Sequence, residues 1–114
     1  SLRRIANNTL VLSTGRPGIY LWLSTDTRGQ TWQSIDIVAY HNGVMDTPHH
    51  IHPRPDGAPA EVPDQTTAYT ELVEVTPNRL LLVYDRIPFG WKGVPLESDE
   101  RNRIYVLPIE VERL

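Results

Sequence analysis

The stretch STGRPGIYLWLSTDTRGQTWQ, residues 13–33, holds an apolar and aromatic segment between two turn sequences. The first turn is Gly15-Arg16-Pro17-Gly18, in which glycine tolerates a positive φ and proline fixes one backbone dihedral. Residues Gly18–Ser24 are rich in Ile, Leu, Tyr and Trp, which favour β-strands. The stretch therefore predicts a strand with a tight turn at each end.

Segments of the same kind recur along the chain and predict further strands. The expected strands are Thr9–Thr14, Gly18–Ser24, Thr31–Val38, Thr66–Val75, Arg79–Arg86 and Asn102–Glu112. Thr76-Pro77-Asn78 lies between two apolar runs and predicts a short hairpin. No segment has a convincing helical pattern. Short strands joined by turns predict an all-β fold of antiparallel sheets, either a sandwich or a propeller.

Residues 39–65 form a long segment that interrupts these strands. Its prolines, which exclude a ladder strand, are Pro48, Pro53, Pro55, Pro59 and Pro63. The segment is too long for a plain connector, so we expect a loop at the rim of a binding site. A second irregular stretch, Pro88–Arg101, carries Phe89 and Trp91, which either line the same mouth or pack at the edge of a sheet.

All 4 histidines lie in the long segment. They are His41, His49, His50 and His52. The two that flank Ile51 can face one side of an extended segment, with Asp46 or Asp56 as a further metal ligand. Their spacing matches no established zinc pattern, so we expect no metal and no cofactor, and the role of the histidines stays open.

The overall composition limits the classes of partner. A chain of 114 residues has the usual size of one small domain, and its net charge of −3 comes without a block of Lys and Arg. Nucleic acid is not an expected partner, because phosphate binding needs a concentrated basic surface. No run approaches the roughly 20 apolar residues of a membrane span, so no membrane partner is expected. Without cysteine, neither a disulfide nor a thiolate metal site can form.

The second turn of the opening stretch, Ser24–Trp32, resembles the Asp box, a hairpin turn that recurs in the blades of sialidase-like propellers. Its aspartate can accept hydrogen bonds from backbone N–H groups, its glycine supplies a positive φ, and its tryptophan covers the turn. The family usually has one residue between Asp and Gly, whereas Thr27 and Arg28 both lie between Asp26 and Gly29. By itself, an Asp box is a structural turn found in proteins of different functions.

Further motifs follow in the order found in the exo-sialidase family. Arg16 precedes the strand that leads into the Asp box, as does the third arginine of the family's carboxylate-binding triad. Tyr69-Thr70-Glu71-Leu72 resembles the motif of the family's tyrosine nucleophile, and the hairpin after it ends in Tyr84-Asp85. The resemblance covers most of residues 9–85. The resemblance implies that residues 1–114 are a carboxy-terminal fragment, and we expect about two blades of a six-bladed β-propeller, since a blade takes roughly 40–50 residues.

The resemblance implies a retaining exo-glycoside hydrolase that acts on sialic acid or a related acidic sugar. Arg16 would bind the substrate carboxylate, for which the planar, forked guanidinium is suited. Tyr69 would be the catalytic nucleophile, because a neutral phenol avoids the repulsion between the substrate carboxylate and an Asp or Glu nucleophile. The resemblance also implies a secreted or periplasmic protein.

The family's other two triad arginines, its acid/base aspartate and its activating glutamate lie upstream of this region, so the chain alone is expected to be inactive. A second hypothesis is a non-catalytic Asp-box domain that binds carbohydrate or protein, in which Arg16 is a solvated loop residue and Tyr69 an ordinary strand aromatic. A third hypothesis has the same architecture but a different acidic sugar as the substrate. The remaining assignments are Trp22, Trp32 and Tyr84 to packing and Asp85 to turn closure.

The expected partner is a sialylated or other acidic glycan. Two blades would leave unpaired strand edges and an uncovered apolar face, so we also expect either the remainder of the propeller or self-association. Size-exclusion chromatography tests this expectation, because a compact monomer of 13.0 kDa contradicts it.

Overall fold

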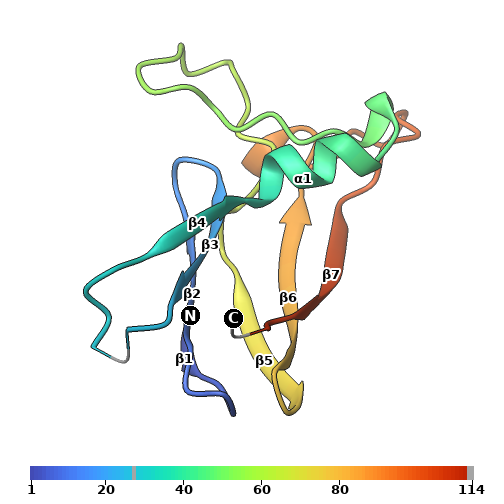
Figure 1. Cartoon of the computed structure of the whole chain (residues 1–114). Helices are drawn as coiled ribbons and strands as arrows, with labels where there is room; N and C mark the ends of the chain where they lie inside the picture. Colours follow the sequence, from blue (N-terminus) through green and yellow to red (C-terminus); the bar gives the residue numbers. More distant parts are fainter. Residues whose placement is uncertain (27, 113–114) are drawn as a thin grey trace.

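The computed structural model describes residues 1–26 and 28–112 of the chain, mostly as two antiparallel sheets (Figure 1). Sheet A has the order β1 (Leu2–Arg4), β2 (Leu10–Gly15), β3 (Ile19–Ser24) and β4 (Gln33–Asp36). Sheet B has the order β5 (Glu71–Thr76), β6 (Arg79–Arg86) and β7 (Arg103–Glu110). The expectation of antiparallel sheets is confirmed, and neither sheet closes on itself within the described residues.

The helical segments lie in the connections between strands. Helix α1 (Ile37–Val44) lies across one end of the two sheets, and the 3-10 turns are η1 (Thr47–His49) and η2 (Gly90–Lys92) (Figure 1). Across the described ranges, no helix is long and apolar enough to cross a membrane.

The predicted turns join the strands that the sequence places beside them. Between β2 and β3, Arg16 has φ 55° and Gly18 has φ 71°, and Arg16 N donates to Gly18 O at 3.2 Å. Between β5 and β6, Asn78 has φ 64°, a conformation that asparagine tolerates better than most residues. Strands β2, β3 and β6 lie close to their predicted bounds, and β7 is somewhat shorter than predicted.

The core lies between the inner faces of sheets A and B. In β6, Leu80, Leu82 and Tyr84 alternate with less buried neighbours and are at most 5% exposed. Full burial of one leucine side chain contributes about 1.5–3 kcal/mol. The buried cluster comprises Ile5, Val11, Ile19, Leu21, Ile37, Val38, Ile51, Leu72, Leu80, Leu82, Tyr84 and Val111. The packing role predicted for Tyr84 is therefore confirmed.

The prediction of a strand through Val38, and of no helix after it, is wrong. Asp36 caps α1, because its side chain accepts a hydrogen bond from Ala39 N at 2.9 Å. The buried side of the helix carries Ile37, Val38 and His41. A β-branched pair favours a strand locally, but the cap and the burial of these side chains stabilise the helix instead.

The predicted strand Thr66–Val75 is also too long at its start, because β5 begins at Glu71. Ala68 has φ 61°, which lies outside the β region. The hydroxyl of Thr66 and the backbone N–H of Thr67 donate to the Asp85 side chain instead of to a neighbouring strand. Residues 66–70 therefore form a separately anchored segment that leads into sheet B.

Candidate functional site

The candidate site begins where the end of β2 meets the segment 66–70. A Cβ built on Gly15 would lie 2.1 Å from the carbonyl oxygen of Ala68, so only glycine allows this approach of the two backbones. Close by, the Thr70 hydroxyl donates to Ser13 Oγ at 2.6 Å. These two contacts hold the turn after β2 against the segment that carries Tyr69.

This packing brings Arg16 and Tyr69 together, although they come from distant parts of the sequence. The guanidinium carbon of Arg16 lies 5.3 Å from the centroid of the Tyr69 ring, within the range of a cation–π contact. Arg16 Nη2 also donates to the carbonyl oxygen of Thr67 at 3.3 Å. Arg16 is exposed and Tyr69 is 67% exposed, so both predicted site residues remain accessible to a ligand.

Asp85 anchors the segment that carries Tyr69, a role that sequence reasoning missed when it assigned this residue to turn closure. One carboxylate oxygen accepts from the Thr66 hydroxyl and from Thr67 N, both at 2.8 Å. The other accepts from the Thr67 hydroxyl at 2.6 Å, and Thr67 Oγ1 accepts from Tyr69 N at 3.2 Å. Strand β6 thereby fixes the backbone of Tyr69.

An open hollow of about 900 Å³ lies beside Arg16. Its lining comes from the turn after β2, the long segment and the stretch after β6, and comprises Arg16, Arg54, residues 60–64 and residues 89–95. Phe89 and Trp91 thus lie around the hollow that Arg16 borders, as does part of the long segment. Tyr69 is not among the lining residues and contacts Arg16 outside the hollow.

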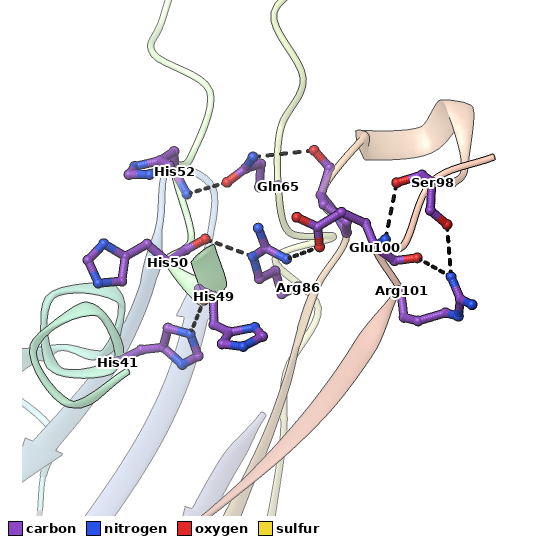
Figure 2. Close-up of polar contacts among 10 residues, drawn as sticks. His41, His49, His50, His52, Gln65, Arg86, Ser98, Glu100 and Arg101 are labelled. Carbon is purple, nitrogen blue, oxygen red and sulfur yellow. Dashed lines mark hydrogen bonds and ion pairs between the residues drawn. The ribbon is translucent and has the colours of Figure 1, made fainter. Parts of the chain in front are cut away.

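Hydrogen bonds join the end of the long segment to the stretch after β6. Ile87 N donates to the carbonyl oxygen of Gln65 at 2.8 Å. The Gln65 side chain accepts from His52 N at 3.0 Å and donates to Pro88 O at 3.3 Å (Figure 2). Gly90 lies against the same segment, since a Cβ on it would be 3.2 Å from Asp64 O. The two walls of the hollow are therefore joined along one edge.

His41 is buried in the core at 1% exposure. Its Nε2 lies 2.9 Å from the carbonyl oxygen of His49, which can only accept, so we assign the proton to Nε2 (Figure 2). Its Nδ1 then accepts from the Tyr84 hydroxyl at 2.8 Å. Burial lowers the pKa of His41 and raises the pKa of Tyr84 to about 12. This pair is a neutral structural contact.

The other histidines are spread over the same region. His50 Nε2 bonds to Met45 O at 3.0 Å, and His52 is exposed. Among residues 1–26 and 28–112, no group of three or more His, Asp and Glu side chains lies close enough together to hold a metal ion.

Arg86 is a buried cation that sequence reasoning did not single out. It is 4% exposed, and its Nε donates to the carbonyl oxygen of His50 at 2.8 Å (Figure 2). Its Nη1 forms an ion pair with Glu100 at 3.2 Å. The signal was present in the sequence, because alternation places Arg86 on the same face of β6 as Tyr84. Its contacts join β6 to the long segment and make it a structural residue.

The turn that resembles an Asp box lies at the other end of sheet A. The Asp26 carboxylate accepts from the Ser24 hydroxyl at 3.0 Å and from backbone N–H groups of the turn. These N–H donors belong to Arg28, Gly29, Gln30 and Thr31. Trp32 Nε1 donates to Gly29 O at 2.7 Å and its ring covers the turn. Of the two residues between Asp26 and Gly29, Thr27 lies outside the described residues.

These bonds determine the ionisation of Asp26. Desolvation opposes its ionisation, but the N–H groups of Gln30 and Thr31, the Ser24 hydroxyl and the N–H of Arg28 together outweigh that effect. They lower the pKa of Asp26 from 3.8 to about 2. The carboxylate is therefore ionised at neutral pH and its accepting capacity is used within the turn.

Compared with protein-family models, with curated proteins and with solved structures, the chain has no match. The candidate site is accordingly defined by its geometry: Arg16 in contact with Tyr69, and the hollow that Arg16 borders.

Proposed function

We propose that the chain is part of a sialidase-like retaining exo-glycoside hydrolase, in which Arg16 and Tyr69 contact an acidic sugar. The observation that carries the proposal is the distance of 5.3 Å between the Arg16 guanidinium and the Tyr69 ring, with both side chains exposed. A guanidinium offers parallel N–H donors to a carboxylate, and an adjacent phenol can act on the carbon that bears this carboxylate.

In the proposed reaction, Tyr69 Oη forms a bond with the anomeric carbon as the bond to the leaving oxygen breaks. Water then releases the sugar, so the configuration at the anomeric carbon is retained. The phenol must lose its proton in the first step, and Glu71 is not assigned as the base. Its carboxylate accepts from the Ser1 hydroxyl and from Leu72 N and pairs with Arg3 at 3.3 Å. The base and the acid belong to blades outside this chain.

Binding to the isolated chain tests the proposal without requiring catalysis. We expect the methyl α-glycoside of N-acetylneuraminic acid to shift the NMR signals of Arg16 and Tyr69, and a neutral galactoside to leave them unchanged. Arg16→Gln should abolish the shifts. Arg28→Gln is the matched control, because it removes a charge from the turn at the other end of sheet A. Equal binding by the two variants would overturn the proposal in favour of a non-catalytic Asp-box domain.

A polypeptide that carries the additional blades tests the catalytic part. In it, Tyr69→Phe should abolish hydrolysis of an aryl sialoside while binding of the methyl sialoside persists. Unchanged hydrolysis by that variant would remove Tyr69 from the reaction.

We also propose that sheets A and B are two blades of a six-bladed propeller, and that further sheets or a second copy cover the outer face of sheet B. Support comes from apolar residues on that face, since Val73 is 45%, Val106 53% and Ile104 75% exposed. Strand β7 is in addition an edge strand, with one side unpaired within the part of the chain that the structure describes. Light scattering should show association that Val106→Glu weakens, and a stable monomer at all concentrations would contradict this.

A further inference from the structure

The hollow beside Arg16 is larger than one sugar ring needs. Its volume is about 900 Å³, near the upper end of the roughly 300–1,000 Å³ of small-molecule sites. Arg16 borders it, whereas most of its lining comes from residues 60–64 and 89–95. A ligand held at Arg16 therefore has room to extend between the long segment and the stretch after β6.

Cations outnumber carboxylates around this hollow. Arg16, Arg54 and Lys92 line it together with Glu61 and Asp64. None of these three cations has an ion-pair partner within the described residues. Asp64 instead accepts from the backbone N–H of Arg54 at 3.4 Å. Two positive charges beyond Arg16 are therefore available to a ligand.

The Arg54 side chain is partly engaged by its own loop, because its Nη2 donates to the carbonyl oxygen of Ala58. A guanidinium has five N–H groups, so this bond leaves donors for a second acceptor. It also restricts the side chain, which reduces the entropy lost when an anion binds. Lys92 ends the turn η2 and is exposed.

Trp91 supplies an apolar surface in the same wall. It is 70% exposed and lies next to Lys92 in η2. An exposed tryptophan in a hollow lined by charged groups is typical of ligand sites, because its ring offers a large rigid surface at low entropic cost. The C–H face of a sugar ring is a suitable partner for that surface.

We propose that this hollow binds an acidic oligosaccharide with anionic groups on two of its sugars. Arg16 holds the first anionic group, Arg54 and Lys92 contact the second, and Trp91 stacks on a sugar ring. The proposal rests on the proposed function, since Arg16 is the anchor in both, and it adds the substrate class: a polyanionic glycan rather than a single terminal acidic sugar.

Calorimetric titration of the whole chain with two probes tests the proposal. The probes are the methyl α-glycoside of N-acetylneuraminic acid and an α2,8-linked dimer of the same sugar. We expect the dimer to bind about tenfold more tightly, a difference equivalent to about 1.4 kcal/mol. In the double variant R54Q/K92Q, the affinity for the dimer should fall to that for the monomer, and the affinity for the monomer should stay within about twofold.

The matched control is R28Q/R103Q, which removes the same charge from exposed residues that do not line the hollow. It should keep the preference for the dimer. Trp91→Phe should remove the change in tryptophan emission that accompanies dimer binding, and Trp91→Ala should weaken that binding. Thermal unfolding of each variant confirms that it is folded, which is expected because all these side chains are exposed.

The outcomes separate this inference from the proposed function. If the monomer binds through Arg16 but the dimer binds no better, or if R54Q/K92Q keeps the preference, the hollow does not hold a second anion. If neither sugar binds, the proposed function and this inference both fail. If the dimer depends on Arg54 and Lys92 but not on Arg16, the proposed function fails, and this inference fails with it because the first anionic group is then not held by Arg16.

Discussion

Each end of sheet A carries a turn with a charged residue, and the two charged residues have different roles. In the turn after β3, Asp26 accepts from a hydroxyl and from successive backbone N–H groups, so its bonding capacity is used within the turn. In the turn after β2, the side chain of Arg16 donates a hydrogen bond to Thr67 O and contacts the ring of Tyr69. The charge at the first end stabilises the turn, whereas the charge at the second remains available to a ligand.

Among the substitutions that test this contrast between the two turns, Gly15→Val is expected to have the largest effect on stability. The new Cβ would lie 2.1 Å from the carbonyl oxygen of Ala68, so the two segments must separate. We expect urea unfolding to show that the free energy of unfolding falls by about 1–3 kcal/mol. Gly43→Ala is the control, because nothing lies within 4 Å of a Cβ there and alanine favours the helix. Equal stability of both variants would contradict the close contact.

The next largest effect is expected from Asp26→Ala. It leaves the backbone N–H groups of Gly29 and Thr31 without their acceptor, so the melting temperature should fall clearly. Asp56→Ala, on the exposed part of the long segment, should leave it nearly unchanged. If both variants melt like the wild-type chain, Asp26 does not stabilise the turn.

The stability of the chain at acid pH should depend on the ionisation of Asp26. The pKa of Asp26 is lowered from 3.8 to about 2, so its contribution to stability is present above pH 3.8 and is lost as the pH falls through about 2. Glu71 and Glu74 also have lowered pKa values, from bonds with the Ser1 hydroxyl and with Ala6 N, so the wild-type loss includes their contributions. The difference in melting temperature between wild type and Asp26→Asn should shrink over this range. If the difference between the two melting temperatures stayed constant over this range, ionisation of Asp26 would not contribute to stability.

The smallest effect on folding is expected from Arg16→Gln. The side chain is exposed, so the free energy of unfolding should change by no more than about 0.5 kcal/mol, while the proposed binding of an acidic sugar should be lost. Urea unfolding beside calorimetric titration measures both. A loss of stability as large as that of Gly15→Val would make Arg16 a structural residue and remove the contrast between the two ends.

Sequence reasoning located the features that depend on local chemistry. Alternation and turn residues predicted β2, β3 and β6 and the turns at Arg16 and Asn78, because these elements follow from neighbouring residues. Helix α1 was missed, since its buried side packs against β3 and the rest of the core, which the local pattern does not contain. The pair of β-branched residues at the start of this helix favours a strand, so the local pattern indicated the wrong element.

The candidate site was predictable only in part. The order of motifs suggested Arg16 and Tyr69, but their contact depends on Gly15 fitting against Ala68, a tertiary contact that the sequence does not reveal. Arg54 and Lys92 carry no motif at all. They line the hollow because Gln65 and Gly90 join two irregular segments.

The anchoring of Tyr69 links the candidate site to the arrangement of the whole molecule. Its segment is attached to β6 through Asp85 and to β2 through Ser13 and Gly15, so one phenol is positioned by both sheets at once. A rotation of one sheet relative to the other would strain these two sets of contacts, which hold the phenol near the guanidinium. A neighbouring sheet that restrained such rotation would thereby adjust sugar affinity from a distance, without touching the sugar.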